Sequence, residues 1–110
     1  MEKKYKVRIT DYALEQMREI QRYIALTLKA PDTAAKWRAR MKTELATLSG
    51  FPARVPLTEE EPWCSRGIHK MVVGKHLVYF WIDEATLTVW ITAVVYGSRD
   101  QRRQLSDMPM

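Results

Sequence analysis

The chain has 110 residues, of which 46% are hydrophobic, and its formal net charge at pH 7 is +5. This length suits one domain with one core, and the hydrophobic content excludes a largely disordered chain. The single cysteine excludes an internal disulfide and no Cys/His cluster has zinc spacing, so the composition predicts a cytoplasmic protein without a metal or other cofactor.

The first ten residues predict a strand with one cationic face. They contain no apolar run of the kind that marks a signal peptide or a membrane span. Apolar and cationic residues alternate with the period of two that is typical of a half-buried strand. The apolar set is Tyr5, Val7 and Ile9, and the cationic set is Lys4, Lys6 and Arg8.

Two amphipathic helices follow. Thr10 or Asp11 is suited to cap the first helix, whose apolar residues recur every three or four positions. Pro31 interrupts the pattern, and Asp32 is expected to cap a second helix that ends at Gly50. The short connection predicts an antiparallel hairpin. The two apolar stripes are Leu14, Met17, Ile20, Tyr23 or Ile24, and Leu28, followed by Ala34, Trp37, Met41, Leu45 and Leu48.

The second helix also carries a run of cations at alternate positions. Lys36 with Arg40, and Arg38 with Lys42, are each four residues apart, a spacing at which like charges on a helix repel each other. The pattern indicates either an anionic partner or a hydrated face.

Residues 51–66 form the one long irregular stretch, because Pro52, Pro56 and Pro62 exclude a helix or a central strand. Alternating apolar residues then predict three strands, and Gly74 opens a tight turn between the first two. These strands span about residues 67–73, 76–82 and 87–96.

The element order β-α-α-β-β-β predicts an α+β fold, with an antiparallel sheet and a helical hairpin packed on one of its faces. We expect a single domain over residues 1–110, with room for a flexible tail at residues 98–110. The last two strands are apolar on both faces, and two helices can cover only one of them. The pattern therefore favours a second face left open for a partner protein; the alternative is that residues 51–66 fold over it.

The whole chain resembles the RelE/ParE toxin family of bacterial type II toxin–antitoxin systems. The resemblance is carried by EIQRYI in the first helix, HKMVVGKHLVYFWIDE through the hairpin and VVYGSRDQRRQL at the end. It implies a growth-inhibiting toxin without a membrane partner, neutralised by a cognate antitoxin with which it forms a hetero-oligomer. An antitoxin segment that folds on the open sheet would contact Val78, Phe80 and Trp90.

The resemblance leaves two activities open. The ending Tyr96-Gly97-Ser98-Arg99-Asp100 is similar to the ParE branch, whose toxins bind and inhibit DNA gyrase without catalysis, and it tips the balance slightly to that branch. Residues that would contact the target are His69, Arg99, Arg102 and Arg103.

The other branch, RelE, implies a metal-independent ribonuclease that cuts messenger RNA on the ribosome. In that case His76 would be the base, Lys70 or Arg99 would hold the phosphate, and Tyr96 would be the acid or a stacking platform. Ribonuclease members usually carry arginine where this chain has His76, which weakens this alternative.

Overall fold

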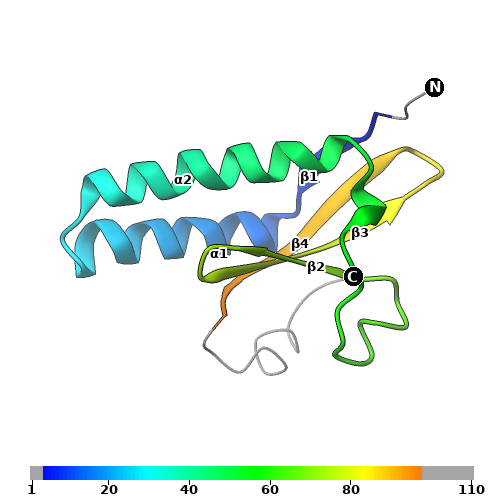
Figure 1. The fold of residues 1–110 in the computed structure, drawn as a ribbon. Helices are drawn as coiled ribbons and strands as arrows, with labels where there is room; N and C mark the ends of the chain where they lie inside the picture. The colour runs from blue at the N-terminus through cyan, green and yellow to red at the C-terminus, as the bar shows by residue number, and fades with distance from the viewer. Residues whose placement is uncertain (1–3, 98–110) are drawn as a thin grey trace.

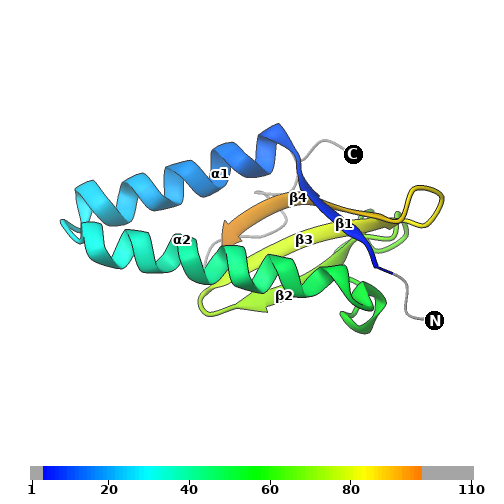
Figure 2. The same cartoon turned by 90° about the horizontal axis from the view of Figure 1, so that it is seen from above.

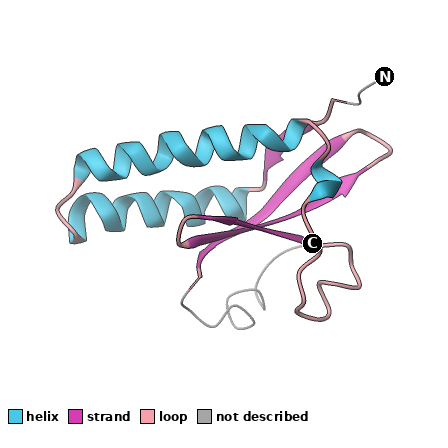
Figure 3. Cartoon of the chain, in the orientation of Figure 1, coloured by secondary structure: helices cyan, strands magenta, loops and turns pink. Residues whose placement is uncertain are grey.

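The computed structural model describes residues 4–97. Figure 1 shows their arrangement, with two long helices on one side and a twisted sheet on the other, and Figure 3 shows the same view by type of secondary structure. The elements are β1 (Lys6–Ile9), α1 (Asp11–Arg22), the π-helix η1 (Tyr23–Thr27), α2 (Pro31–Ala46), the 3₁₀ helices η2 (Thr47–Ser49) and η3 (Pro52–Arg54), β2 (His69–Val73), β3 (His76–Asp83) and β4 (Thr88–Tyr96).

The fold is α+β, as predicted, and the order of strands in the sheet is β1-β4-β3-β2. Strands β2, β3 and β4 pair antiparallel, with Val73 opposite His76 and Trp81 opposite Trp90. Strand β1 adds parallel to β4, so the sheet is mixed and not purely antiparallel. The helical hairpin connects β1 at one edge to β2 at the other, and Figures 1 and 2 show α1 and α2 side by side on one face.

The two helices begin where the chain can satisfy their first turns. The Thr10 hydroxyl accepts a hydrogen bond from the Ala13 N–H at 3.2 Å, which makes Thr10 the N-cap of α1. Helix α2 begins at Pro31, a residue favoured at the first helical position, so Asp32 lies inside the first turn and does not cap it. Gly50 follows η2 in an extended conformation rather than as a left-handed helix end.

The helix-facing core contains the residues that the sequence assigned to an open face. Val78 and Phe80 are fully buried and belong to one cluster with Met41 and Leu45 of α2. The expectation that these two side chains are exposed for an antitoxin is therefore wrong. Strand alternation correctly puts them on one face, but it could not tell that this is the face that the helical hairpin covers.

The second face is covered as well, by the proline-containing segment. Trp63 and Ile68 pack on Leu77 and Tyr79, and all four are buried. The segment is anchored by strand-like hydrogen bonds, from Thr58 N–H to the Ile68 carbonyl at 2.8 Å and from Lys70 N–H to the Pro56 carbonyl at 3.1 Å. The prolines leave room for only the short 3₁₀ helix η3 and allow an extended chain, so the alternative that residues 51–66 close this face holds for this part of the sheet. The prediction of an open second face is wrong there.

Truncating the central strand will test its burial. Phe80→Ala should lower the free energy of unfolding by about 3–5 kcal/mol, because it leaves a cavity in the core. Phe51→Ala makes the same chemical change at a side chain that is 70% exposed and should stay within about 0.5 kcal/mol of the parent. Urea denaturation followed by circular dichroism measures both, and similar losses for the two variants would contradict this assignment of the core.

Candidate functional site

The exposed apolar side chains gather at one end of the molecule rather than on the sheet. In residues 4–97 the large exposed ones are Tyr23, Leu26, Leu28, Phe51, Leu57, Val72 and Tyr96. The first three belong to the end of the first helix and its connection to α2, and Tyr96 ends β4. The remaining three are scattered over the loop and the β2 edge. The candidate site is therefore the place where the tip of the helical hairpin faces the ends of β3 and β4.

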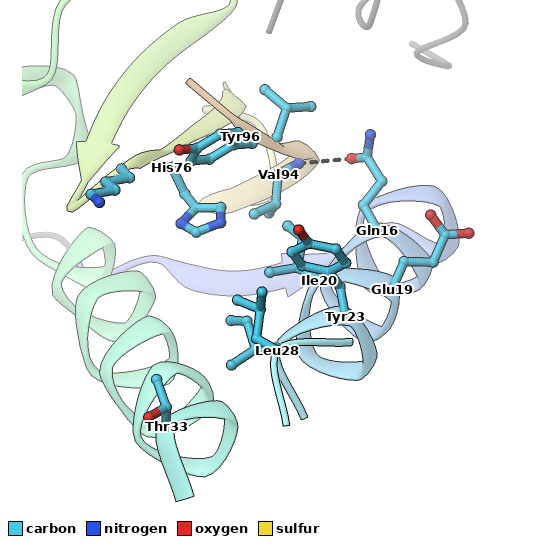
Figure 4. Close-up of a pocket in the computed structure, with 12 residues that line it drawn as sticks. Gln16, Glu19, Ile20, Tyr23, Leu28, Thr33, His76, Val94 and Tyr96 are labelled. Carbon is cyan, nitrogen blue, oxygen red and sulfur yellow. Dashed lines mark hydrogen bonds between the residues drawn. The ribbon is translucent and has the colours of Figure 1, made fainter. Parts of the chain in front are cut away.

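A pocket of about 690 Å³ occupies this place. Figure 4 shows its two walls, with His76, Val94 and Tyr96 on the sheet side and Ile20, Tyr23 and Leu28 on the helix side. Its full lining is Gln16, Glu19, Ile20, Tyr23, Ile24, Leu28, Thr33, Lys75, His76, Val94, Val95 and Tyr96. The walls are apolar, with a few polar groups from Gln16, Glu19, Lys75 and His76, which is typical of a binding groove.

The π-helix η1 shapes the helix wall of this pocket. It follows α1 directly, and Tyr23 and Leu26 within it are exposed. Leu28 closes it through an N–H bond to the Tyr23 carbonyl at 3.1 Å, and Lys29 then turns the chain with a positive φ of 52°. Short π-helical turns often occur at functional sites. The irregular turn thus contributes Tyr23 and Ile24 to the wall of the pocket.

The pocket also borders an incomplete edge of the sheet. Strand β1 pairs only with Thr88–Ile91, so it covers fewer than half of the residues of β4. Beyond that point the Val94 N–H donates to the side-chain oxygen of Gln16 at 2.8 Å, and no strand takes this place among the described residues. A side chain of α1 therefore substitutes for a neighbouring strand where the pocket begins.

His76 is held by the helical hairpin. The indole N–H of Trp37 on α2 donates to Nδ1 of His76 at 3.2 Å, and the two rings meet edge to face at 5.2 Å between centroids. Burial lowers the pKa of the His76 imidazole below its usual range. Since Nδ1 accepts a hydrogen bond, the neutral ring carries its proton on Nε2. His76 is thus a neutral link between α2 and β3.

Of the predicted ribonuclease residues that the structure describes, His76 and Tyr96 come together and Lys70 does not. They face each other across the β3–β4 ladder, with ring centroids 5.6 Å apart. Lys70 points to the opposite face of the sheet, where its ammonium pairs with Glu60 at 3.4 Å. The proposed convergence of Lys70 on His76 is therefore wrong. Arg99 lies outside the described residues.

The predicted target and antitoxin contacts are also separated. His69 stacks on Phe80 at 5.0 Å and donates from Nδ1 to the Val55 carbonyl at 2.7 Å, roughly 13 Å along the strand from the His76 end. Trp90 is half-buried and lies opposite Trp81. Arg102 and Arg103 lie outside the described residues, like Arg99.

Sequence reasoning missed several residues of this site. Trp37 was expected to be a core residue only, and Tyr23 and Leu28 were assigned to the buried stripe of the first helix. The polar role of Gln16 had no signal in the sequence. The apolar stripe of the first helix continues almost to Pro31. This was the one sign in the sequence that its last turn extends beyond the core.

No metal site accompanies the pocket: the residues that the structure describes contain no group of three or more His, Cys, Asp or Glu side chains able to hold an ion. Cys64 is a free, half-buried thiol in the segment over the second face. Among the helices of residues 4–97, none has the length and apolar character needed to cross a membrane.

Comparison with known proteins identifies the family. The model of the family described as ParE toxin of type II toxin–antitoxin system, parDE, matches residues 7–101. The chain therefore belongs to this family and is a toxin of the type II toxin–antitoxin class. None of the curated protein sequences is a significant match.

Solved structures agree on the fold. The chromosomal ParDE system from P. aeruginosa has a TM-score of 0.66 at 14% identity, over 84% of this chain and 95% of the other. The RelBE2 toxin–antitoxin complex from Mycobacterium tuberculosis has a TM-score of 0.57 at 21% identity, over 84% of this chain and 98% of the other. A mutant of the E. coli toxin RelE in the free state has a TM-score of 0.58 at 12% identity, over 92% of each chain. At such low sequence identity, these structural similarities show a shared fold and no more.

The buried, neutral state of His76 has a consequence for stability. Its pKa is lower in the folded than in the unfolded chain, so the unfolded chain gains a proton first as the pH falls below about 6.5. The stability that the neutral ring contributes is present above that pH and is lost below it. The difference in unfolding free energy between the parent and His76→Leu should therefore shrink from pH 7 to pH 5. Urea titrations at both pH values measure it; a constant difference would show that His76 titrates normally.

Proposed function

We propose that this toxin acts by binding and inhibiting DNA gyrase, and that a cognate antitoxin neutralises it. The observation that carries the proposal is the hydrogen bond from the Trp37 indole to His76. It engages the nitrogen that a general base would need, and it gives the histidine a structural task. An inhibitor that works by binding needs no catalytic set, and membership of the ParE family agrees with this activity.

Proton chemistry argues in the same direction. A neutral imidazole has one donor and one acceptor nitrogen, and the acceptor of His76 faces Trp37. The remaining nitrogen can only donate until the ring changes its tautomer. The cation that would stabilise a phosphorane is not supplied by Lys70, which pairs with Glu60 on the other face.

The second candidate is ribosome-dependent cleavage of messenger RNA. The neighbouring rings of His76 and Tyr96 at the pocket favour it, since a tyrosine beside a histidine can stack on a base or move a proton. It would require the His76 ring to leave Trp37 when the substrate binds.

Two assays on the purified protein decide between these activities. We expect it to block DNA supercoiling by gyrase at near-stoichiometric concentration, and His76→Gln to retain at least about half of that effect, since no step uses the imidazole as a base. We expect no cleavage of messenger RNA on the ribosome. Cleavage that disappears in His76→Gln, together with normal supercoiling in the presence of the parent protein, would assign the toxin to the ribonuclease branch.

We further propose that the antitoxin docks at the pocket and not on the sheet. Both faces of the central strands are covered, whereas Tyr23 and Leu28 are exposed in the lining of a groove that borders an incomplete edge of β4. A segment with regularly spaced apolar side chains fits such a groove, and a stretch of backbone beside β4 could add hydrogen bonds to it.

Matched substitutions test this docking site. Leu28→Asp should weaken binding of the protein encoded beside this one, the expected antitoxin, by at least about tenfold, because it puts a charge into an apolar contact at the pocket. Phe51→Asp and Val72→Asp are controls, since Leu28, Phe51 and Val72 are all exposed in the free protein, at 55%, 70% and 67%. Titration calorimetry measures the three affinities. A loss confined to Phe51→Asp or Val72→Asp would place the antitoxin elsewhere.

A further inference from the structure

The outer surface of α2 carries four exposed cations without anionic partners. Lys36, Arg38, Arg40 and Lys42 are all exposed. The ion pairs within residues 4–97 are Arg18 with Glu15 and Lys70 with Glu60, and neither involves α2. Like charges four residues apart repel each other on a helix. The uncompensated charge makes α2 a candidate for binding an anion.

The four cations form two rows on opposite flanks of the helix. Each residue turns the helix by about 100°, so Lys36 and Arg40 lie on one flank and Arg38 and Lys42 on the other, about 160° apart around the axis. The buried residues Ala34, Met41 and Leu45 lie between these flanks on the side that faces the sheet. The side that faces outward lies between the same two rows.

That outward side is a low ridge of small residues. It consists of Ala35, Ala39, Thr43 and Ala46, all of them exposed. The Thr43 hydroxyl donates to the Ala39 carbonyl at 3.1 Å, so it turns back onto the helix. Figure 1 shows α2 along the top of the molecule, with no other described element above it. A partner can therefore approach the helix axis closely.

From this arrangement we propose that α2 binds duplex DNA by entering its major groove, with the two rows of cations meeting the phosphates of the two groove walls. The rows lie on opposite flanks, and on one of them the exposed Arg40 guanidinium lies beside Gly74 of the β2–β3 turn. A partner that meets both rows must therefore be anionic on both sides of the helix. The major groove of B-form DNA is about 12 Å wide and 8.5 Å deep, and a helix with its side chains is about 10–12 Å across.

Other anionic partners fit this shape less well. An acidic helix packed on the ridge would lie on one side of α2 and would meet both rows only at their inner edges. The major groove of A-form RNA is deep and too narrow to admit α2. Alanine and threonine offer little to base edges, so the contact is with phosphates and is independent of sequence.

The carboxylates of α2 fix where the DNA lies along the helix. Asp32 is exposed and is on the outward side in the first turn, about 10 Å along the axis from Ala39. Glu44 is half-buried on the flank nearer the sheet. The contact is therefore centred on Ala39, away from Asp32. This DNA binding goes beyond inhibition of gyrase, because it requires no gyrase.

Fluorescence anisotropy of the full-length protein with a labelled DNA duplex of about 20 base pairs tests the proposal. The logarithm of the affinity should fall with the logarithm of the salt concentration with a slope of about −3 to −4, because each neutralised phosphate contributes about −0.9. Lys36→Gln with Arg40→Gln, and Arg38→Gln with Lys42→Gln, should each reduce the magnitude of this slope by about 2.

Three further variants sharpen the test. Ala39→Glu should lower the affinity by at least about tenfold, and Asp32→Asn should raise it, since both change the charge that faces the phosphates. Lys6→Gln with Arg8→Gln removes two exposed cations of β1 and should leave the slope within about 0.5 of the parent value. All these sites are exposed, so a thermal melt should show each variant folded.

Four results would overturn the proposal. The first is that the parent protein does not bind DNA, and the second is that the β1 control loses as much slope as the α2 double variants. The third is an affinity for an RNA duplex of the same length that equals the affinity for DNA. The fourth is an affinity for polyglutamate that equals the affinity for DNA and is reduced by the α2 substitutions in the same way. The last would identify the surface as a site for an acidic protein. None of these results depends on whether the toxin inhibits gyrase, so the two proposals can fail separately.

Discussion

Burial of the central strands from both sides is the constraint on which the rest of this structure depends. The helical hairpin covers Val78 and Phe80, and the segment with Trp63 and Ile68 covers Leu77 and Tyr79. A sheet whose middle is sealed in this way offers little of it to a partner. Interaction is left to the margins, namely the pocket at the hairpin tip and the outer side of α2.

The pocket exists because the elements around it stop or deviate at the same end of the molecule. Strand β1 is too short to pair with the whole of β4, so the Val94 N–H donates to the side chain of Gln16 instead. Tyr23 in the π-helical turn is exposed. His76, at the start of β3, is tied to Trp37 and helps to form the opposite wall. Each feature is a small departure from regular structure, and together they leave apolar surface in contact with solvent.

The sequence predicted the helices and strands but not which faces of the sheet they cover. Period-two alternation and the Thr10 cap located the strands and the first helix, because these signals are local. Whether Val78 faces a helix or solvent depends on contacts between distant segments, to which alternation is blind. The prolines of residues 51–66 excluded a long helix and left only the 3₁₀ helix η3. The apolar Trp63, together with Ile68 just after the segment, was the sign that this stretch packs on the sheet.

The site shows the same limit. The bond between Trp37 and His76 joins residues 39 positions apart in sequence, and no period relates them. Lys70 and His76 were grouped because both flank the same hairpin. Lys70 pairs with Tyr79, which is three positions from His76, so strand alternation puts Lys70 and His76 on opposite faces of the sheet. The cations of α2 were visible in the sequence, and only the burial of Ala34, Met41 and Leu45 shows which side of the helix they flank.

Hydrogen–deuterium exchange of the free toxin and of its complex with the antitoxin tests most directly where this molecule is free to bind. The account predicts that β3 is already protected in the free protein and gains little, whereas new protection appears at residues 20–28 and 94–96. New protection concentrated in β3 and in residues 51–68, with none at the hairpin tip, would mean that the covering segment is displaced and that the sheet is the binding surface after all.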